Sequence, residues 1–197
     1  MKIICIECTH NNPFSLEPIF FLKPETALIR GNKPFFYPNF STNITYSISL
    51  VYRICRVGRH ISERFAHRYY DAVGIGIEFT ASDILQNCQQ NGLPWEKAKS
   101  FDGSTVISNN FIPIEQLVDK EKITFQLVKN DKTVQQYESD KMFFSIDKII
   151  GDISRFLMLK IGDLIFTGTP TNSEKIEKGD VLKASVFGKM MLEIKVC

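Results

Sequence analysis

The stretch "NITYSISLVYRI", residues 43–54, is the segment from which both the fold and the site can be argued. Its β-branched and aromatic residues are typical of a β-strand. Because strand side chains alternate between two faces, Ser47 and Ser49 must share one face. Two small hydroxyls that face the same environment raise the question of what that environment holds.

Composition narrows the classes of protein that need be considered. A chain of 197 residues with 44% hydrophobic residues is sufficient for one compact domain, expected over residues 1–197. The formal charge is only +2 with no sustained basic block, so nucleic acid is not an expected partner. No apolar run approaches the roughly 18 residues of a membrane span, and the N-terminal run is too short for a signal peptide. We therefore expect a soluble, cytoplasmic protein without a membrane partner.

Five cysteines are scattered through apolar segments, and we expect them to be reduced thiols. Cys5 and Cys8 form a C-x-x-C pair followed by His10. A structural zinc site usually needs a second pair at comparable spacing, so buried strand cysteines are the favoured interpretation, and a rebuilt metal site at Cys5, Cys8 and His10 is the alternative.

Most of the remaining pattern is that of β-strands. Short strands are predicted in "EPIFFLKP" and "TALIR", within residues 17–30, with prolines at their edges. Residues 122–137 predict a hairpin that turns at Asn130-Asp131, and residues 179–196 predict another, with Gly188 at its turn.

Three helices are expected against this background. Residues 145–157 carry a helical stripe of apolar side chains with Ser145 as the N-cap. Another is predicted from Ser62, and a third from an N-cap at Thr80 to a stop at Gly92. Without a βαβ rhythm, the order of elements favours an α+β, mostly β fold over a doubly wound one.

Three further stretches carry residues suited to chemistry. "LKIGDLIFTGTP" leads a strand into Thr167-Gly168-Thr169-Pro170, which can present hydroxyl and amide donors to an anion or form a surface turn. In "KSFDGS", Lys99 and Asp102 can converge from one loop or form a surface ion pair. Glu78 ends a buried-looking strand, where a carboxylate needs a cation, a hydrogen-bond donor or solvent.

Taken in order, "PIFFLKPETALI", "KSFDGS" and "IGDLIFTGTP" resemble the fumarylacetoacetate hydrolase family, including its 2-hydroxyhepta-2,4-diene-1,7-dioate isomerase and acylpyruvase-like members. The resemblance covers nearly the whole chain from Glu17 onward. It implies a mixed β-sandwich roll, as in the family's C-terminal domain, assembled as a homodimer. It also implies a divalent cation, Mg2+ or Mn2+, that stabilises the enolate formed from a small oxo-acid during hydrolysis, decarboxylation or isomerisation.

The resemblance places two metal-ligand positions of the family within residues 43–54. Where the family has Tyr-Glu-x-Glu-Leu, with both glutamates as metal ligands, this chain reads Tyr46-Ser47-Ile48-Ser49-Leu50. The third ligand, an aspartate in the family, aligns with Glu78. The arginine of that family motif aligns with Ser82, and its glutamine with Leu85, Gln86 lying one place out of register. Hard divalent cations depend on several carboxylate oxygens, so weak or absent metal binding is predicted, with slow turnover.

Other family positions are kept. The resemblance implies Lys99 and Asp102 as catalytic residues and a substrate-binding set of Gln135, Thr167, Gly168 and Thr169, although these residues could also persist as loop braces. Residues 1–17 correspond to a shortened lid region, in which His10 and Glu17 are candidate remnants of a water-activating pair.

Three hypotheses about the function remain open at this point. The first is an enzyme of the family with weakened activity, in which Glu78, Lys99, Asp102 and water hold a cation weakly. The second is a non-catalytic homologue that binds an oxo-acid or partners another subunit. The third is the thiol-centred metal site described above.

Overall fold

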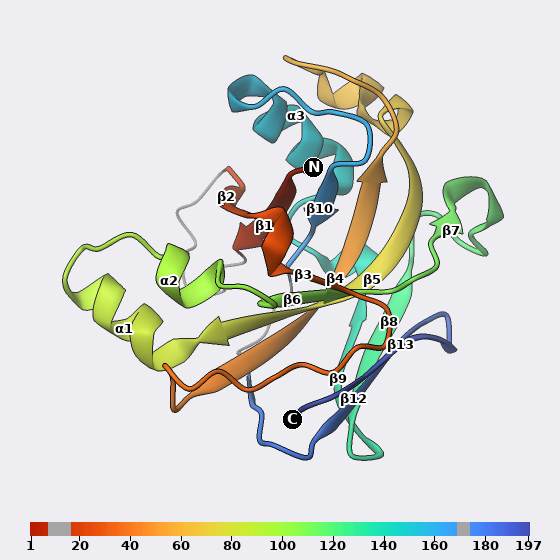
Figure 1. Cartoon of the computed structure of the whole chain (residues 1–197). Helices are drawn as coiled ribbons and strands as arrows, with labels where there is room; N and C mark the ends of the chain where they lie inside the picture. The colour runs from red at the N-terminus through yellow and green to blue at the C-terminus, as the bar shows by residue number, and fades with distance from the viewer. Residues whose placement is uncertain (8–16, 169–173) are drawn as a thin grey trace.

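The structure, a computed structural model, describes residues 1–7, 17–168 and 174–197, and its described strands form two sheets (Figure 1). The predicted mostly β fold is confirmed. The expected strand over residues 43–54 is β4 (Ile44–Ile54), and it pairs antiparallel along its whole length with β5 (Tyr70–Ala81). Figure 1 shows these two long strands, β4 and β5, crossing the centre of the molecule.

The larger sheet has the strand order β2-β1-β10-β4-β5-β6-β3, with β11 added on β4 and β7 on β5. It is mixed, because β1 pairs parallel with β10 and β3 pairs parallel with β6. The two strands expected within residues 17–30 are therefore confirmed as β2 and β3. The bounds are β1 Ile3–Glu7, β2 Ile19–Lys23, β3 Leu28–Arg30, β6 Thr105–Ile107, β7 Ile112–Pro113, β10 Leu164–Phe166 and β11 Glu174–Lys175.

The smaller sheet, ordered β13-β12-β8-β9, is built from the two predicted hairpins. β8 (Thr124–Lys129) and β9 (Lys132–Glu138) are joined by Asn130-Asp131, both with positive φ. β12 (Val181–Val186) and β13 (Lys189–Lys195) are joined through Gly188 at φ 74°. Positive φ at these turns matches the twist of a tight hairpin.

The main core lies between the two sheets. On β4, Tyr46, Ile48 and Leu50 point into this core, where they meet side chains such as Phe125 and Leu182 of the smaller sheet. Ser47 and Ser49 consequently point to the other face of β4, where Val51 belongs to a smaller apolar cluster. That cluster consists of Ile3, Cys5, Val51, Ile107, Leu164 and Phe166.

The helices lie outside the sheets. The predicted helix with a Ser145 cap is confirmed as α3 (Ile146–Phe156), whose Lys148 amide donates to Ser145 Oγ at 3.1 Å. It covers the outer face of β1 through Ile149, Ile150 and Ile153. The remaining helical segments are α1 Ser82–Gln90, α2 Glu96–Lys99 and the 3-10 turns η1 Glu25–Ala27, η2 Glu63–Arg68, η3 Ile114–Gln116 and η4 Ser139–Lys141.

Two helix predictions need correction. The segment from Ser62 forms only the 3-10 turn η2 before β5 begins at Tyr70, because its residues are needed to pair with β4. Thr80 is not an N-cap: β5 continues to Ala81, and α1 begins after it without a side-chain cap. Strand pairing has therefore overridden a local capping signal. Gly92 does follow the helix, at φ 62°.

None of the described helices is long and apolar enough to cross a membrane.

Candidate functional site

The site begins where β4 and β5 lie side by side. Ser47 is opposite Glu78 and Ser49 is opposite Gly76 in the antiparallel register. Ser49 Oγ donates to Glu78 Oε1 at 2.9 Å, and both side chains are buried. The carboxylate predicted to need a partner therefore has one in a neutral hydroxyl, at a position where the family resemblance places a second carboxylate.

Strands β1 and β2 bring two further groups to this face. Burial raises the pKa of the Cys5 thiol well above its usual value, and the charge of the neighbouring Glu78 adds to that rise. Burial lowers the pKa of the Lys23 ammonium, while Cys5 and Glu78 act in the opposite direction. Cys5 is thus a neutral thiol beside a buried carboxylate, as expected for a strand cysteine, and Lys23 is a cation close to both.

The loop that follows α2 anchors two lysines through one serine. Lys23 Nζ donates to the Ser104 carbonyl at 2.8 Å and lies 3.3 Å from Ser104 Oγ. The Ser104 hydroxyl in turn donates to the Lys99 carbonyl at 3.0 Å. This network ties the Lys23 side chain to the backbone that follows Lys99, and both lysines are buried.

Lys99 ends α2, and its ammonium forms an ion pair with Glu7 at the end of β1. It also lies 4.8 Å from the centre of the Phe21 ring, a favourable position for a cation. Lys99 therefore pairs with Glu7 and not with Asp102, contrary to the expected convergence. Asp102 is exposed and lines a different cavity of about 510 Å3 together with Arg30 and other residues of β3 and its loop.

The predicted substrate-binding residues lie on two elements. Gln135 reaches from β9 across the core, where its Oε1 accepts from the Ile48 amide at 3.1 Å and its buried Nε2 has no partner in the described residues. The Thr167 amide donates to the Leu50 carbonyl at 3.0 Å, directly after β10, and Gly168 follows with φ 71°. Thr169 lies outside the described residues.

The lid and thiol hypotheses are tested only in part. Cys8 and His10 lie outside the described residues. The four described cysteines, Cys5, Cys55, Cys88 and Cys197, are free thiols. Glu17 forms an exposed ion pair with Arg155 of α3 at 3.0 Å, so its described contact is with the surface of that helix.

The donor set at the three expected ligand positions does not suit a hard divalent cation. Ser47 and Ser49 offer neutral oxygens, and one oxygen of Glu78 is already used by the Ser49 hydroxyl. Within residues 1–7, 17–168 and 174–197, no group of three or more His, Cys, Asp or Glu side chains is arranged to hold a metal. The nearby ammonium groups of Lys23 and Lys99 would also repel a metal cation.

Sequence reasoning missed two members of this charge cluster. Lys23 stands inside "PIFFLKP", one of the stretches that carried the family resemblance, so that motif could have identified it. Glu7 had no such signal, because it only interrupts an apolar run. Its role becomes visible only in the folded chain, where it forms an ion pair with Lys99 at the end of α2.

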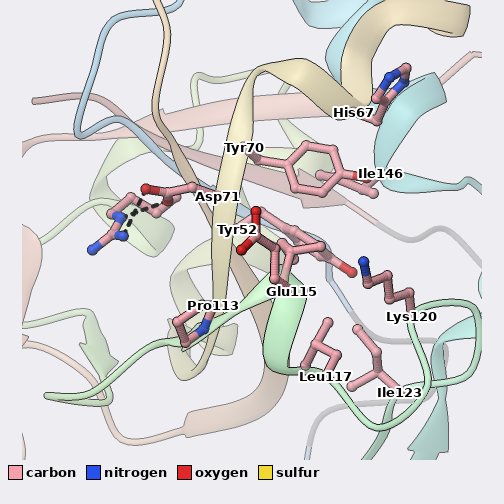
Figure 2. A pocket seen from close by; sticks show the side chains of 12 residues that line it. Tyr52, His67, Tyr70, Asp71, Pro113, Glu115, Leu117, Lys120, Ile123 and Ile146 are labelled. Carbon is pink, nitrogen blue, oxygen red and sulfur yellow. Dashed lines mark hydrogen bonds and ion pairs between the residues drawn. The ribbon is translucent and has the colours of Figure 1, made fainter.

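A second cavity, of about 680 Å3, lies on the other side of β4 (Figure 2). It is lined by Tyr52, Tyr70 and the loop around Glu115 and Lys120. Tyr52 shares its face of β4 with Tyr46, Ile48 and Leu50, the face opposite Ser47 and Ser49. The predicted site residues are absent from its lining among the described residues. The candidate site is therefore the face of β4 and β5 that carries Ser49 and Glu78.

Comparison with known proteins identifies the family of the chain. The sequence profile of the fumarylacetoacetate (FAA) hydrolase C-terminal domain matches residues 5–197. Human mitochondrial oxaloacetate tautomerase FAHD1 is 33% identical over 180 residues, which are 91% of this chain and 81% of the relative. A fumarylacetoacetate hydrolase family protein from Yersinia pestis CO92 superposes with a TM-score of 0.92 at 31% identity, covering 100% of this chain and 93% of the other.

A structure with a named ligand is also similar. Fumarylpyruvate hydrolase from Pseudomonas aeruginosa, in complex with Mn2+ and pyruvate, has a TM-score of 0.91 at 26% identity, covering 100% of this chain and 89% of that one. The profile match, the sequence relatives and the common fold lead to one conclusion: this chain belongs to the fumarylacetoacetate hydrolase family.

Proposed function

We propose that this protein acts on small 2-oxo acids of the oxaloacetate or acylpyruvate type by moving a proton between their keto and enol forms. The observation that carries the proposal is the buried Glu78 carboxylate, held by Ser49 at 2.9 Å in a region that also contains the Lys23 and Lys99 ammonium groups. The names of the relatives support the substrate class, since they include oxaloacetate tautomerases and a fumarylpyruvate hydrolase crystallised with pyruvate.

Among the reactions of these relatives, tautomerisation requires the fewest catalytic groups. It requires a base that removes a proton from the carbon beside the carbonyl and a cation that stabilises the resulting enolate oxygen. The protonated base or solvent then returns a proton to that oxygen, which gives the enol and restores the base. Glu78 is the carboxylate in position to take the proton, and Lys99 is the cation that can receive the negative charge. No carbon-carbon bond has to break. Hydrolysis or decarboxylation of the same substrates is expected to be slower still.

The turnover of the enol form of oxaloacetate, followed by ultraviolet absorbance in a buffer containing EDTA, tests this function. Wild-type protein should accelerate the conversion, and Glu78→Gln should reduce the enzymatic rate by about 100-fold or more. Circular dichroism checks that the variant is folded. An equal rate for the variant would remove Glu78 from the mechanism.

A second function is supported by the loss of carboxylates at Ser47 and Ser49. In it the protein is a non-catalytic homologue that binds an oxo-acid or partners another subunit. Binding of oxalate by the wild type without any acceleration of oxaloacetate conversion would favour this function over the enzyme.

The metal preference of the family, Mg2+ or Mn2+, is proposed to be weak or lost here because two ligand positions are hydroxyls. Ser47→Glu combined with Ser49→Glu should restore Mn2+ binding, since the new carboxylates would lie beside Glu78 and would need a cation to be stable there. Calorimetric titration with Mn2+ measures this gain. The Ser47→Gln, Ser49→Gln protein has the same added volume without charge, and Mn2+ binding by that control would contradict the explanation.

The expected homodimer and the expected cytoplasmic location also remain proposals. Some named relatives are mitochondrial proteins, so the compartment has to be determined by fractionation of the source cells.

A further inference from the structure

The charge cluster contains one carboxylate that the proposed reaction does not use. Glu7 ends β1, its side chain is 25% exposed, and it forms an ion pair with Lys99, whose side chain is 10% exposed. Glu7 belongs to the same face of β1 as Cys5, which contacts Glu78. Glu7 therefore enters the site from its more open side, while Glu78 occupies its buried side.

The two lysines of the cluster differ in what holds them. Lys23 Nζ is satisfied by the carbonyl and hydroxyl of Ser104. Lys99 Nζ has Glu7 as its one hydrogen-bond acceptor within the described part of the chain. An ammonium group has three protons to donate, so Lys99 is the cation that can still bind an incoming carboxylate. In the free protein, Glu7 occupies the position beside Lys99 that this carboxylate would take.

The balance of charge points in the same direction. Lys23 and Lys99 are matched by Glu7 and Glu78, so the cluster is neutral as it stands. A dianionic oxo-acid would add two negative charges to a partly buried region that already holds two. Its binding is favourable only if Glu7, the more exposed of the two resident carboxylates, leaves Lys99.

We propose that Glu7 is an internal competitor of the substrate: it occupies Lys99 in the free protein, and an oxo-acid carboxylate must displace it to bind. This inference rests on the proposed function, because it assumes that Lys99 receives the substrate. Glu7 is a residue that sets affinity and acts through Lys99. It favours ligands with a strongly anionic carboxylate, which can replace its own ion pair, over neutral or weakly anionic ones.

The test is the affinity for oxalate, a non-reactive dicarboxylate, measured by calorimetry in EDTA. Glu7→Gln keeps the size of the side chain and removes its charge, so it should bind oxalate about 10-fold more tightly than wild type or better, the range expected for losing one charge-assisted hydrogen bond. Glu7→Asp keeps the competing charge and should bind oxalate with an affinity close to that of wild type. If Glu7 only held Lys99 in position, Glu7→Gln should instead bind oxalate more weakly than wild type.

A matched control is available in the smaller sheet. Glu138 pairs with Lys122 and Lys141, and its side chain is 24% exposed, close to the 25% of Glu7. Glu138→Gln makes the same chemical change in a similar ion pair and should leave the affinity for oxalate unchanged. Lys99→Met should lower that affinity by at least 10-fold in the Glu7→Gln background, because it removes the group that the ligand needs.

Fluorescence gives an independent readout. Trp95 is the only tryptophan of the chain, and its carbonyl accepts from the Lys99 amide at 3.0 Å, so its emission should respond when Lys99 changes partner. Oxalate should change the emission of wild type and act at lower concentration on Glu7→Gln. Equal or weaker affinity of Glu7→Gln than of wild type would overturn the inference, as would absence of binding to both proteins. Failure of the proposed function is recognised separately, by absence of oxaloacetate turnover in the wild type.

Discussion

The Ser49 hydroxyl occupies a position that demands a hydrogen bond. It is fully buried and donates to Glu78 Oε1 at 2.9 Å, where little water can take its place. Ser49→Ala should therefore lower the free energy of unfolding by about 1–3 kcal/mol, the cost of leaving a buried charged acceptor short of a donor. Urea denaturation measures the change.

Ser47→Ala is the matched control for that experiment. Ser47 lies on the same face two residues earlier, is only half-buried, and is opposite Glu78 in the register without bonding to it. The same deletion there should change the free energy of unfolding by less than about 0.5 kcal/mol. Equal losses at both positions would show that the Ser49 contact contributes nothing specific.

At the scale of the element, β5 needs glycine where the Phe166 side chain of β10 reaches across β4. A Cβ on Gly76 would overlap the Phe166 ring and would lie 3.0 Å from the Val106 carbonyl oxygen. We expect Gly76→Ala to cost about 1–3 kcal/mol of unfolding free energy, because backbone of β6 cannot yield easily. Gly151→Ala in α3, where the nearest atoms are 3.6 Å from the added Cβ, should instead stabilise by about 0.5–1 kcal/mol. Thermal unfolding of both variants should show opposite shifts, and a loss of stability in both would contradict this account.

The first turn of α3 contains a carboxyl group that makes stability depend on pH. Burial raises the pKa of Asp147, against the opposing effects of the hydrogen bond from Tyr70 and the charge of His67. The folded protein therefore holds this proton more tightly than the unfolded chain. The resulting stabilisation is present below the ordinary aspartate pKa and is lost as pH rises through the raised value.

Asp147→Asn removes that titration and keeps an acceptor for Tyr70. The unfolding free energy of the variant, relative to wild type, should therefore increase between about pH 3.5 and about pH 7. Urea denaturation at the two pH values measures it. A relative stability that falls with pH would mean that the Tyr70 hydrogen bond outweighs burial.

At the scale of the whole molecule, the sequence was informative wherever local pattern and global pairing agree. The two hairpins carry their turn residues at the turns, and α3 carries its own cap, so these elements could be predicted directly. The start of α1 could not, because pairing of β5 with β4 extends the strand past Thr80. Such long-range pairing leaves little trace in a window of neighbouring residues.

The candidate site also contains residues that could be predicted from the sequence and residues that could not. Ser47, Ser49 and Glu78 could be assigned to one face because strand periodicity and the family resemblance reinforced each other, and the structure places Ser49 against Glu78. Glu7 could not be assigned, since its partner Lys99 is 92 positions away and meets it only in the folded chain. The lysine that sequence reasoning paired with a neighbour in its own loop is paired across the fold instead.

The proposed homodimer makes a prediction about an exposed apolar surface. Val57 is 52% exposed and Ile161 is 69% exposed, and the bridge between Gly58 and Leu159 places their loops side by side. Adjacent exposed apolar side chains of this kind are common at subunit interfaces. Wild type should sediment as a dimer at micromolar concentration, and Ile161→Glu should shift it to monomer, because a charge buried at an interface without a partner is costly. Met190→Glu, at a 59% exposed position on the smaller sheet, should remain dimeric. If Met190→Glu dissociates and Ile161→Glu does not, the interface lies on the smaller sheet. A wild type that stays monomeric at every concentration would show that the homodimer is wrong.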